Sequence, residues 1–327
     1  MTTARQRLNE FLFPASSDTW LIVLRVGLAI QVILCTLSLR SDWNYLFRAN
    51  GNGIISRDLT EAILNVDSPI IPRVGWLVAI GAYFGLSEET VLWTVWIALF
   101  FTGWLLLLGL FCRITAVTAW LLHLCAVKSA GLMTYGMDNF TTLGLFYLAI
   151  APLPNHYSLD RWIWKSKNQD PHLLGFFRRV LQVHVCIIYF FSGLAKSTGA
   201  GWWNGTSLWR SLRLPPYDVL PSQLVVTFAP VLPAMGIAVC LLEICYPIFI
   251  WPNKTRFIWL LVICGMHIAI AVTMGLYLFA LIMIVLNLAA FGPWAGRKQR
   301  DTTNLAVQKV SLRFVRNPVR SLIGIIS

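Results

Sequence analysis

Residues 257–292 have the sequence FIWLLVICGMHIAIAVTMGLYLFALIMIVLNLAAFG, and this stretch decides the fold class. It contains no aspartate, glutamate, lysine or arginine, and it is long enough for nearly two membrane crossings, each of which takes about 20 residues. The chain of 327 residues is 57% hydrophobic and 12% charged, whereas soluble domains average about 45–50% and about 25%. The composition excludes a soluble enzyme, a disordered chain and a Cys-rich secreted scaffold. It predicts an all-α, polytopic integral membrane helical bundle.

The apolar runs along the chain predict about eight transmembrane helices. A further segment, 70–86, is interrupted by glycine and proline and carries Arg73, so we expect it to be interfacial or re-entrant. We expect residues 1–294 to form one transmembrane domain and residues 295–327 to form a basic, amphipathic cytoplasmic tail. The eight predicted spans are 20–39, 90–111, 114–131, 140–153, 179–195, 224–251, 257–273 and 275–292.

The chain has 26 lysines and arginines against 14 acidic residues, a formal net charge of +12. With the N-terminus inside, most basic residues fall on the inner segments and the tail, which is the bias of cytoplasmic loops. We therefore predict that both termini are cytoplasmic and that membrane lipids, rather than nucleic acid, balance this charge. No RNP sequence, Cys/His finger or helix-turn-helix pattern indicates nucleic-acid binding. The spacing of the 7 cysteines fits no metal or disulfide framework.

Ionisable residues inside the predicted spans are few, and each is a candidate for function because charge is costly in hydrocarbon. Arg25 lies in the first span and Glu243 in the sixth. Both fall in the inner half by residue count, so they could form a structural ion pair or relay protons. His123, His184 and His267 lie in the third, fifth and seventh spans. No two histidines are four residues apart, which favours hydrogen-bonded packing, and no metal is expected.

One face of the fifth span carries a stripe that ends at the outer membrane boundary. Its members recur at three- and four-residue steps and are Gln182, Val185, Tyr189, Ser192 and Lys196. Two interpretations of Lys196 stay open. It can extend to the interface beside a tryptophan belt, here Trp202 and Trp203, purely as an anchor. Alternatively, a lysine held away from water gives up its proton readily and can act as a base near neutral pH.

Several sequence blocks occur in the order found in a known family. The most specific is Tyr189-Phe190-x-x-Gly193-x-x-Lys196, followed by Trp203-x-Gly205. The others are Leu24-Arg25-x-Gly27, Gly136-x-Asp138-Asn139, Tyr157-Ser158-Leu159-Asp160, Glu243, Gly265-x-His267, Met274-Gly275-Leu276 and Asn287-Leu288. On these blocks, from about residue 20 to residue 294, the chain resembles the vitamin K-dependent γ-carboxylase-like membrane family, also called HTTM (horizontally transferred transmembrane domain) proteins.

The resemblance implies a specific chemistry. In the carboxylase branch, the lysine at the position of Lys196 deprotonates vitamin K hydroquinone on the outer side of the membrane. The resemblance thus implies a quinone or hydroquinone cofactor and a lyase or oxidoreductase of the carboxylase/epoxidase type. On this hypothesis the substrate is bound by Tyr189, Ser192, Asn139, Trp202, Trp203 and His267. Structural support or proton relay would come from Arg25, Glu243 and His184.

The chain also departs from the carboxylase branch. Ala195 stands where the branch has the first of two paired lysines, and Asn139 stands where it has a histidine. We expect no large lumenal substrate-binding domain after the last span. These departures put glutamate carboxylation in doubt.

Two other functions therefore stay open. The chain can be a non-catalytic maturation or interaction protein for a small secreted peptide or a neighbouring membrane protein. Short bacterial members of the family include one that matures a sporulation-delaying toxin. The partner surface would then be the outer segments 40–89 and 196–223, near Trp43 and Trp209. A small-molecule transporter is less favoured, because no internal repeat is evident. The resemblance to short members implies a bacterial inner membrane as the location.

Overall fold

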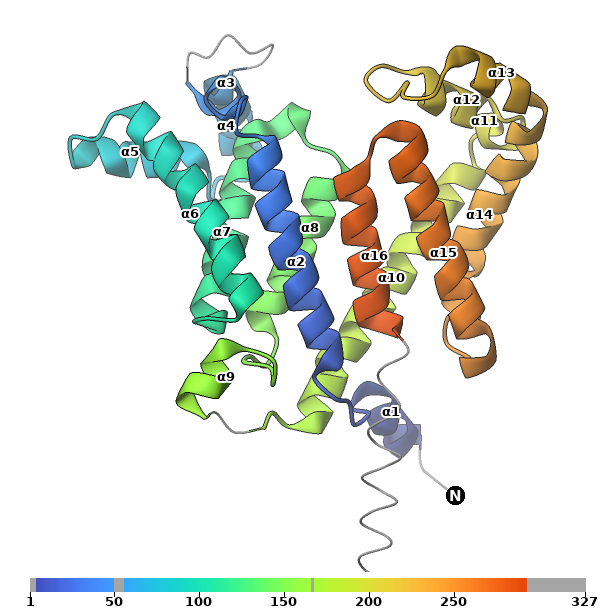
Figure 1. Cartoon of the computed structure of the whole chain (residues 1–327), viewed down its shortest axis with the longest axis horizontal. Helices are drawn as coiled ribbons and strands as arrows, with labels where there is room; N and C mark the ends of the chain where they lie inside the picture. Colours follow the sequence, from blue (N-terminus) through green and yellow to red (C-terminus); the bar gives the residue numbers. More distant parts are fainter. Residues whose placement is uncertain (1–3, 50–55, 166–167, 293–327) are drawn as a thin grey trace, which may run out of the picture.

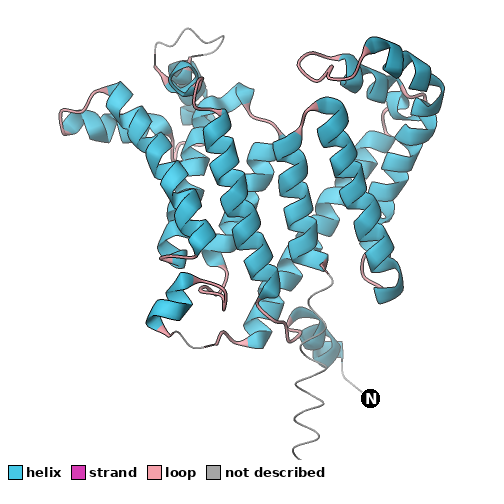
Figure 2. Ribbon diagram, viewed as in Figure 1, coloured by secondary structure: helices cyan, strands magenta, loops and turns pink. Residues whose placement is uncertain are grey.

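The computed structural model describes residues 4–49, 56–165 and 168–292. These residues form an all-helical bundle, and no strand occurs in the three described ranges (Figure 2). The predicted fold class is therefore confirmed. The predicted tail, 295–327, lies outside the described residues.

Five helical segments of the described chain are long and apolar enough to cross a membrane. They are α2 (Thr19–Ser38), α6 (Glu88–Leu108), α10 (Pro171–Ser197), the segment Ser222–Phe249, and α15 (Asn253–Met274). The fourth of these is not one regular helix. It consists of α13 (Ser222–Phe228), the 3₁₀ turn η2 (Ala229–Val231) and α14 (Leu232–Phe249).

The other three predicted spans also fall on helices. These are α7 (Cys112–Ala130), α8 (Gly136–Ile150) and α16 (Tyr277–Phe291). At 1.5 Å per residue, the two 15-residue helices α8 and α16 are about 22 Å long, shorter than a hydrocarbon core of about 30 Å. Packing holds them in place, because α16 contacts α2, α8, α10 and α15, and α7 packs between α6 and α8 (Figure 1).

α2 is the central helix of the bundle. Its side chains Trp20, Leu21, Leu24 and Leu28 are at most 1% exposed, and it packs against α6, α8 and α16. Lipid is as apolar as these side chains, so an apolar side chain is removed from water equally well by lipid and by a neighbouring helix. The hydrophobic effect therefore does not select one arrangement of helices within the membrane. Close packing and buried polar contacts select it instead.

The segment 70–86 forms a short helix rather than a span. α5 (Val74–Tyr83) follows α4 (Arg57–Asp67) and packs against α6 and α7. Arg73, just before α5, is 1% exposed. Its guanidinium donates to Asn65 Oδ1 at 2.6 Å, Pro69 O at 2.9 Å and Glu61 O at 3.1 Å. Protein oxygens thus satisfy the hydrogen-bond donors of this arginine. A segment at the membrane edge needs such partners, because lipid offers none to its backbone or to its charge.

The connecting helices gather at two ends of the bundle (Figure 1). One end carries α3 (Trp43–Phe47), α4, α5, the 3₁₀ turn η1 (Gly131–Met133), α11 (Ala200–Trp203), α12 (Thr206–Arg213) and α13. The opposite end carries α1 (Ala4–Leu12) and α9 (Leu159–Trp164). Both predicted outer segments, 40–89 and 196–223, therefore lie at one end, which is called the outer end below. Which end faces the cytoplasm stays a prediction.

Candidate functional site

Lys196 lies in the last turn of α10 and is bound by two oxygens. Its Nζ donates to Ser192 Oγ at 2.6 Å, one turn earlier on the same helix, and to Glu243 Oε2 of α14 at 2.6 Å. The Lys196 side chain is 23% exposed and that of Glu243 is 6% exposed. The ammonium also lies 5.5 Å from the centre of the Trp202 ring. The four residues Lys196, Ser192, Glu243 and Trp202 are called the lysine cluster below.

Glu243 reaches Lys196 because α10 and α14 approach each other closely at Gly193. A Cβ atom at Gly193 would lie 2.8 Å from the backbone nitrogen of Ile244 and 2.8 Å from Glu243 Cβ. Real Cβ atoms essentially never approach another atom so closely, so only glycine permits this backbone contact. Gly193 belongs to the sequence block that carries the family resemblance, and the structure gives its physical role.

The ion pair suggested between Arg25 and Glu243 is wrong. Arg25 donates through Nη1 to Leu106 O and, at 2.9 Å, to Leu107 O, and through Nη2 to Tyr157 O at 2.9 Å. The first two carbonyls belong to the last turn of α6, where helical N–H partners run out. Arg25 is therefore a structural link between α2, α6 and the segment before α9. Glu243 instead accepts from Lys196 of α10, so residue counting gave the two residues a similar depth but the wrong partner.

A buried polar network lies next to the lysine cluster. Tyr189 Oη and His267 Nε2 are 2.7 Å apart, and Asn287 Nδ2 donates to Tyr189 Oη at 2.7 Å. Tyr246 Oη donates to Asn287 Oδ1, also at 2.7 Å. All four residues are at most 2% exposed. They come from α10, α14, α15 and α16, so this tyrosine network ties four helices together.

One backbone carbonyl fixes the orientation of the Asn287 amide in the tyrosine network. Asn287 Nδ2 also donates to Met283 O at 2.8 Å, and because a carbonyl only accepts, the amide nitrogen must face it. The second amide proton goes to Tyr189 Oη, and among the described residues His267 Nε2 is the acceptor within reach of the Tyr189 proton, so we infer that Tyr189 donates to it. The neutral imidazole of His267 therefore carries its proton on Nδ1.

The Nδ1 atom of His267 has no hydrogen-bond partner among the described residues, although the side chain is buried. A buried donor without a partner costs about 1–3 kcal/mol. The charge of Lys196 acts on His267 and that of Glu243 acts on Tyr189, so the lysine cluster and the tyrosine network are electrostatic neighbours. Together they offer a partly exposed cation, a buried carboxylate and one uncommitted buried donor.

The remaining predicted site residues lie elsewhere. Asn139 lines a cavity of about 220 Å³ with Lys128 and Asp67, and in the described part of the chain it forms no hydrogen bond with Lys196. His184 Nδ1 lies 2.8 Å from Tyr147 Oη. His184 is twelve residues before Lys196 on α10, so the two residues are about 18 Å apart along the helix axis. Trp203 Nε1 donates to Ser197 O at 2.8 Å and so anchors α11 to the end of α10.

Sequence reasoning missed Asn287 and Tyr246 as site residues. Asn287 is the one amide side chain of the last apolar run, 275–292, and a polar residue at that depth is itself a signal of a buried network. Tyr246 gave no comparable signal, because tyrosine is common near the ends of spans. In the part of the chain that the structure describes, no group of three His, Cys, Asp or Glu residues is placed to hold a metal ion.

The sequence around this site matches a known domain family. The family model of the HTTM domain matches residues 83–293, which is more than half of the chain. The chain belongs to the HTTM family. The matched range contains the whole lysine cluster and the whole tyrosine network of this HTTM protein, whereas Arg25 lies before it. Neither the curated proteins nor the solved structures gave a significant match. With five long apolar helical segments among its described residues, the HTTM protein is an integral membrane protein.

Proposed function

We propose that this HTTM protein is a membrane enzyme that withdraws a proton from a lipid-soluble substrate of the quinol type, with Lys196 as the base. The observation that carries the proposal is the 2.6 Å contact between Lys196 Nζ and Glu243 Oε2, where Glu243 is almost fully buried. A base works only if its own proton has somewhere to go, and here the acceptor is already in contact.

The proton balance follows from this contact. Lys196 passes one proton to Glu243, which leaves a neutral amine and a neutral carboxylic acid. In a low-dielectric site, a neutral pair avoids the desolvation penalty that an ion pair incurs. The amine then takes the proton of the substrate hydroxyl group, and the oxyanion that forms is next to the new ammonium group. The 23% of the Lys196 side chain that is exposed gives the site a path for proton exchange at the outer end.

His267 and Ser192 have separate tasks in this proposal. The Nδ1–H group of His267 is the uncommitted donor that can bind the substrate oxygen as negative charge develops on it. Tyr189 fixes the orientation of that imidazole through Nε2. Ser192 accepts from Lys196 Nζ at 2.6 Å and so directs the amine along α10.

The residues present suit a quinone-type group, which the family resemblance implies. A quinone presents oxygens that need a donor, and the orphaned Nδ1–H of His267 is such a donor. The Trp202 ring beside Lys196 offers an aromatic face to a flat ring. When bound, such a group would supply redox chemistry, which would make the enzyme a lyase or oxidoreductase of the carboxylase/epoxidase type.

Mass spectrometry of small molecules released from the purified protein tests the proposal. We expect a quinone or hydroquinone to be retained by the wild-type chain and its occupancy to fall at least tenfold in His267→Phe. Lys196→Met should keep the bound molecule, because it removes the base and leaves the donor in place. Cys264→Ala, on the same helix as His267, is the matched control. Retention that is equal in wild type and His267→Phe would contradict the assignment of His267.

A second candidate is a maturation or interaction protein for a secreted peptide or a neighbouring membrane protein. The exposed apolar side chains of the outer end favour it, because Val66 is 84% exposed, Ile70 88% and Tyr83 87%. Trp43 does not belong to such a surface, since it is 1% exposed and donates to Leu92 O. This candidate predicts a peptide that co-purifies in fixed ratio, no bound quinone, and full maturation activity in Lys196→Met.

We also propose a bacterial inner membrane as the location, with both termini cytoplasmic and anionic lipids as partners. Arg178, Arg179 and Arg256 lie near one another at the end opposite to the lysine cluster, where each donates to backbone carbonyls. Basic residues at one end are typical of the cytoplasmic side. A periplasm-active reporter fused after residue 292 should be inactive, and an active fusion would reverse the orientation.

A further inference from the structure

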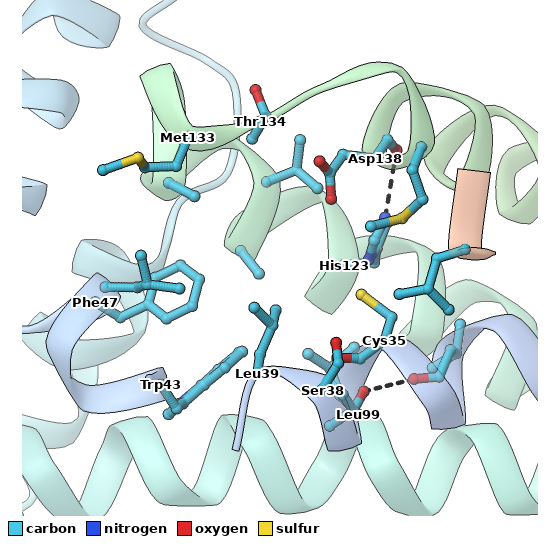
Figure 3. A pocket seen from close by; sticks show the side chains of 18 of the residues that line it. Cys35, Ser38, Leu39, Trp43, Phe47, Leu99, His123, Met133, Thr134 and Asp138 are labelled. Carbon is cyan, nitrogen blue, oxygen red and sulfur yellow. Dashed lines mark hydrogen bonds between the residues drawn. The ribbon is translucent and has the colours of Figure 1, made fainter. Parts of the chain in front are cut away.

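A separate cavity of about 270 Å³ lies in the outer half of the bundle, among α2, α3, the end of α7 and the start of α8 (Figure 3). None of its lining residues belongs to the lysine cluster or the tyrosine network. Apolar side chains form most of its wall. Figure 3 shows Trp43 and Phe47 on one side and the imidazole of His123 and the carboxylate of Asp138 on the other.

The serine and threonine hydroxyl groups on the wall of this cavity are already committed, whereas the phenol of Tyr135, also on the wall, donates to no described residue. Thr36 Oγ1 donates to Val32 O at 2.7 Å. Ser38 Oγ donates to Cys35 O at 2.8 Å, and Thr134 Oγ1 donates to Gly131 O at 2.7 Å. The indole nitrogen of Trp43 donates away from the cavity, to Leu92 O at 2.8 Å. A ligand in the cavity therefore meets few uncommitted donors.

Two hydrogen-bond acceptors on the wall are uncommitted. His123 Nε2 lies 3.4 Å from the backbone oxygen of Asp138, and because that carbonyl only accepts, Nε2 carries the proton. The other ring nitrogen, Nδ1, is then an acceptor, and no described residue donates to it. Asp138 Oδ2 accepts from the backbone N–H of Tyr135 at 3.0 Å, while Oδ1 accepts from no described residue.

We propose that this cavity binds a neutral, apolar molecule with a hydroxyl group, which donates to His123 Nδ1 or Asp138 Oδ1 while its apolar body packs against Trp43 and Phe47. The wall favours this class, because its serine and threonine donors are committed, while His123 Nδ1 and Asp138 Oδ1 are acceptors that still need a donor. Lipid-soluble ligands in general occupy mostly apolar pockets with a few convergent polar groups, and this cavity has that composition.

A cationic amine fits the cavity less well. One carboxylate faces the space, and its Oδ2 already accepts from Tyr135 N–H. Stripping water from an ammonium group costs far more than stripping it from a hydroxyl group. Further anionic or polar groups around the ammonium would be needed to offset that cost, and the rest of the wall is largely apolar.

Equilibrium binding of tritiated 4-phenylphenol to the purified full chain, measured by scintillation proximity, tests the proposal. Unlabelled 4-methoxybiphenyl lacks the hydroxyl donor, and 4-phenylbenzylamine carries a cation. The two competitors therefore distinguish a site for a neutral hydroxyl donor from an apolar site and from a site for a cation. We expect saturable binding that 4-methoxybiphenyl displaces at least tenfold more weakly than unlabelled 4-phenylphenol does. Equal competition by 4-methoxybiphenyl, or stronger competition by 4-phenylbenzylamine, would overturn the assignment.

Variants locate the binding in this cavity. Ala126→Phe, which fills the space from α7, should abolish saturable binding, and His123→Phe should weaken it at least tenfold. Leu121→Phe, on the same helix but exposed and outside the cavity wall, is the matched control. If Ala126→Phe fails to fold, Ala130→Phe at the same wall replaces it. Wild-type affinity in a folded filling variant would refute the proposal. Lys196→Met should leave this binding unchanged, so its outcome is independent of the proposed enzyme.

Discussion

Lys196 and Glu243, 47 residues apart in sequence, form an ion pair of 2.6 Å between α10 and α14. The pair is enclosed by Ser192 and Trp202, and Gly193 brings the two helices close enough for it to form. Nearly everything proposed about catalysis depends on this contact.

The Lys196–Glu243 pair predicts that the stability losses of the two single variants are strongly non-additive in the double variant. Glu243→Leu leaves a cation without its carboxylate, and Lys196→Met leaves a buried carboxylate, so each should lower the free energy of unfolding by about 3 kcal/mol. The double variant removes both charges and should lie within about 1 kcal/mol of wild type. Denaturation midpoints in detergent measure the cycle, and additive losses would show that the pair does not form.

Gly193 predicts a steric effect with a matched control in the same protein. Gly193→Ala places a methyl group 2.8 Å from Ile244 N, so it should cost about 1–3 kcal/mol and separate α10 from α14. Gly265→Ala, in the middle of α15, meets no atom within 4 Å and should be neutral or up to about 1 kcal/mol stabilising. Equal thermal midpoints for the two variants would contradict the close approach.

The tyrosine network predicts the tautomer of His267. In the wild-type chain, ¹⁵N NMR of labelled histidine should show His267 protonated on Nδ1 and unprotonated on Nε2. Tyr189→Phe removes the donor to Nε2, so the signals should shift toward a mixture of tautomers. Tyr147→Phe, which removes the partner of His184, is the control and should leave His267 unchanged. A wild-type His267 protonated on Nε2 would reverse the deduced directions.

Arg25 predicts a loss of stability without a loss of ligand. Arg25→Met leaves the carbonyls of Leu107 and Tyr157 without their donor, and that of Leu106 with the 3.2 Å bond from Gly109 N–H alone, so it should cost about 2–3 kcal/mol. Arg25→Lys keeps part of the bonding and should cost less. Both variants should retain any bound quinone at wild-type occupancy in the mass spectrometric assay. Loss of the quinone from a folded Arg25→Lys protein would indicate a role in the site.

The sequence alone predicted the fold class and the positions of the helices. All eight predicted spans fall on helices, because length and apolar composition are properties of a segment by itself. The prediction that one stripe of residues forms a common face of α10 is also confirmed, since Gln182, Val185 and Tyr189 are buried and Lys196 is half-buried. A helical period fixes which residues share a face without reference to any neighbour.

Only the tertiary structure decided which polar residues meet. Depth counted along the sequence suggested that Glu243 pairs with Arg25, whereas the structure places Glu243 beside Lys196, where α10 and α14 approach closely at Gly193. Asn287 was a conspicuous polar residue, yet its bonds to Tyr189 and Tyr246 require two other helices. In the membrane, apolar faces pack almost equally well against lipid and protein, so partner choice depends on close backbone approach and on satisfied polar groups. Both are properties of pairs of helices, and a single segment does not encode them.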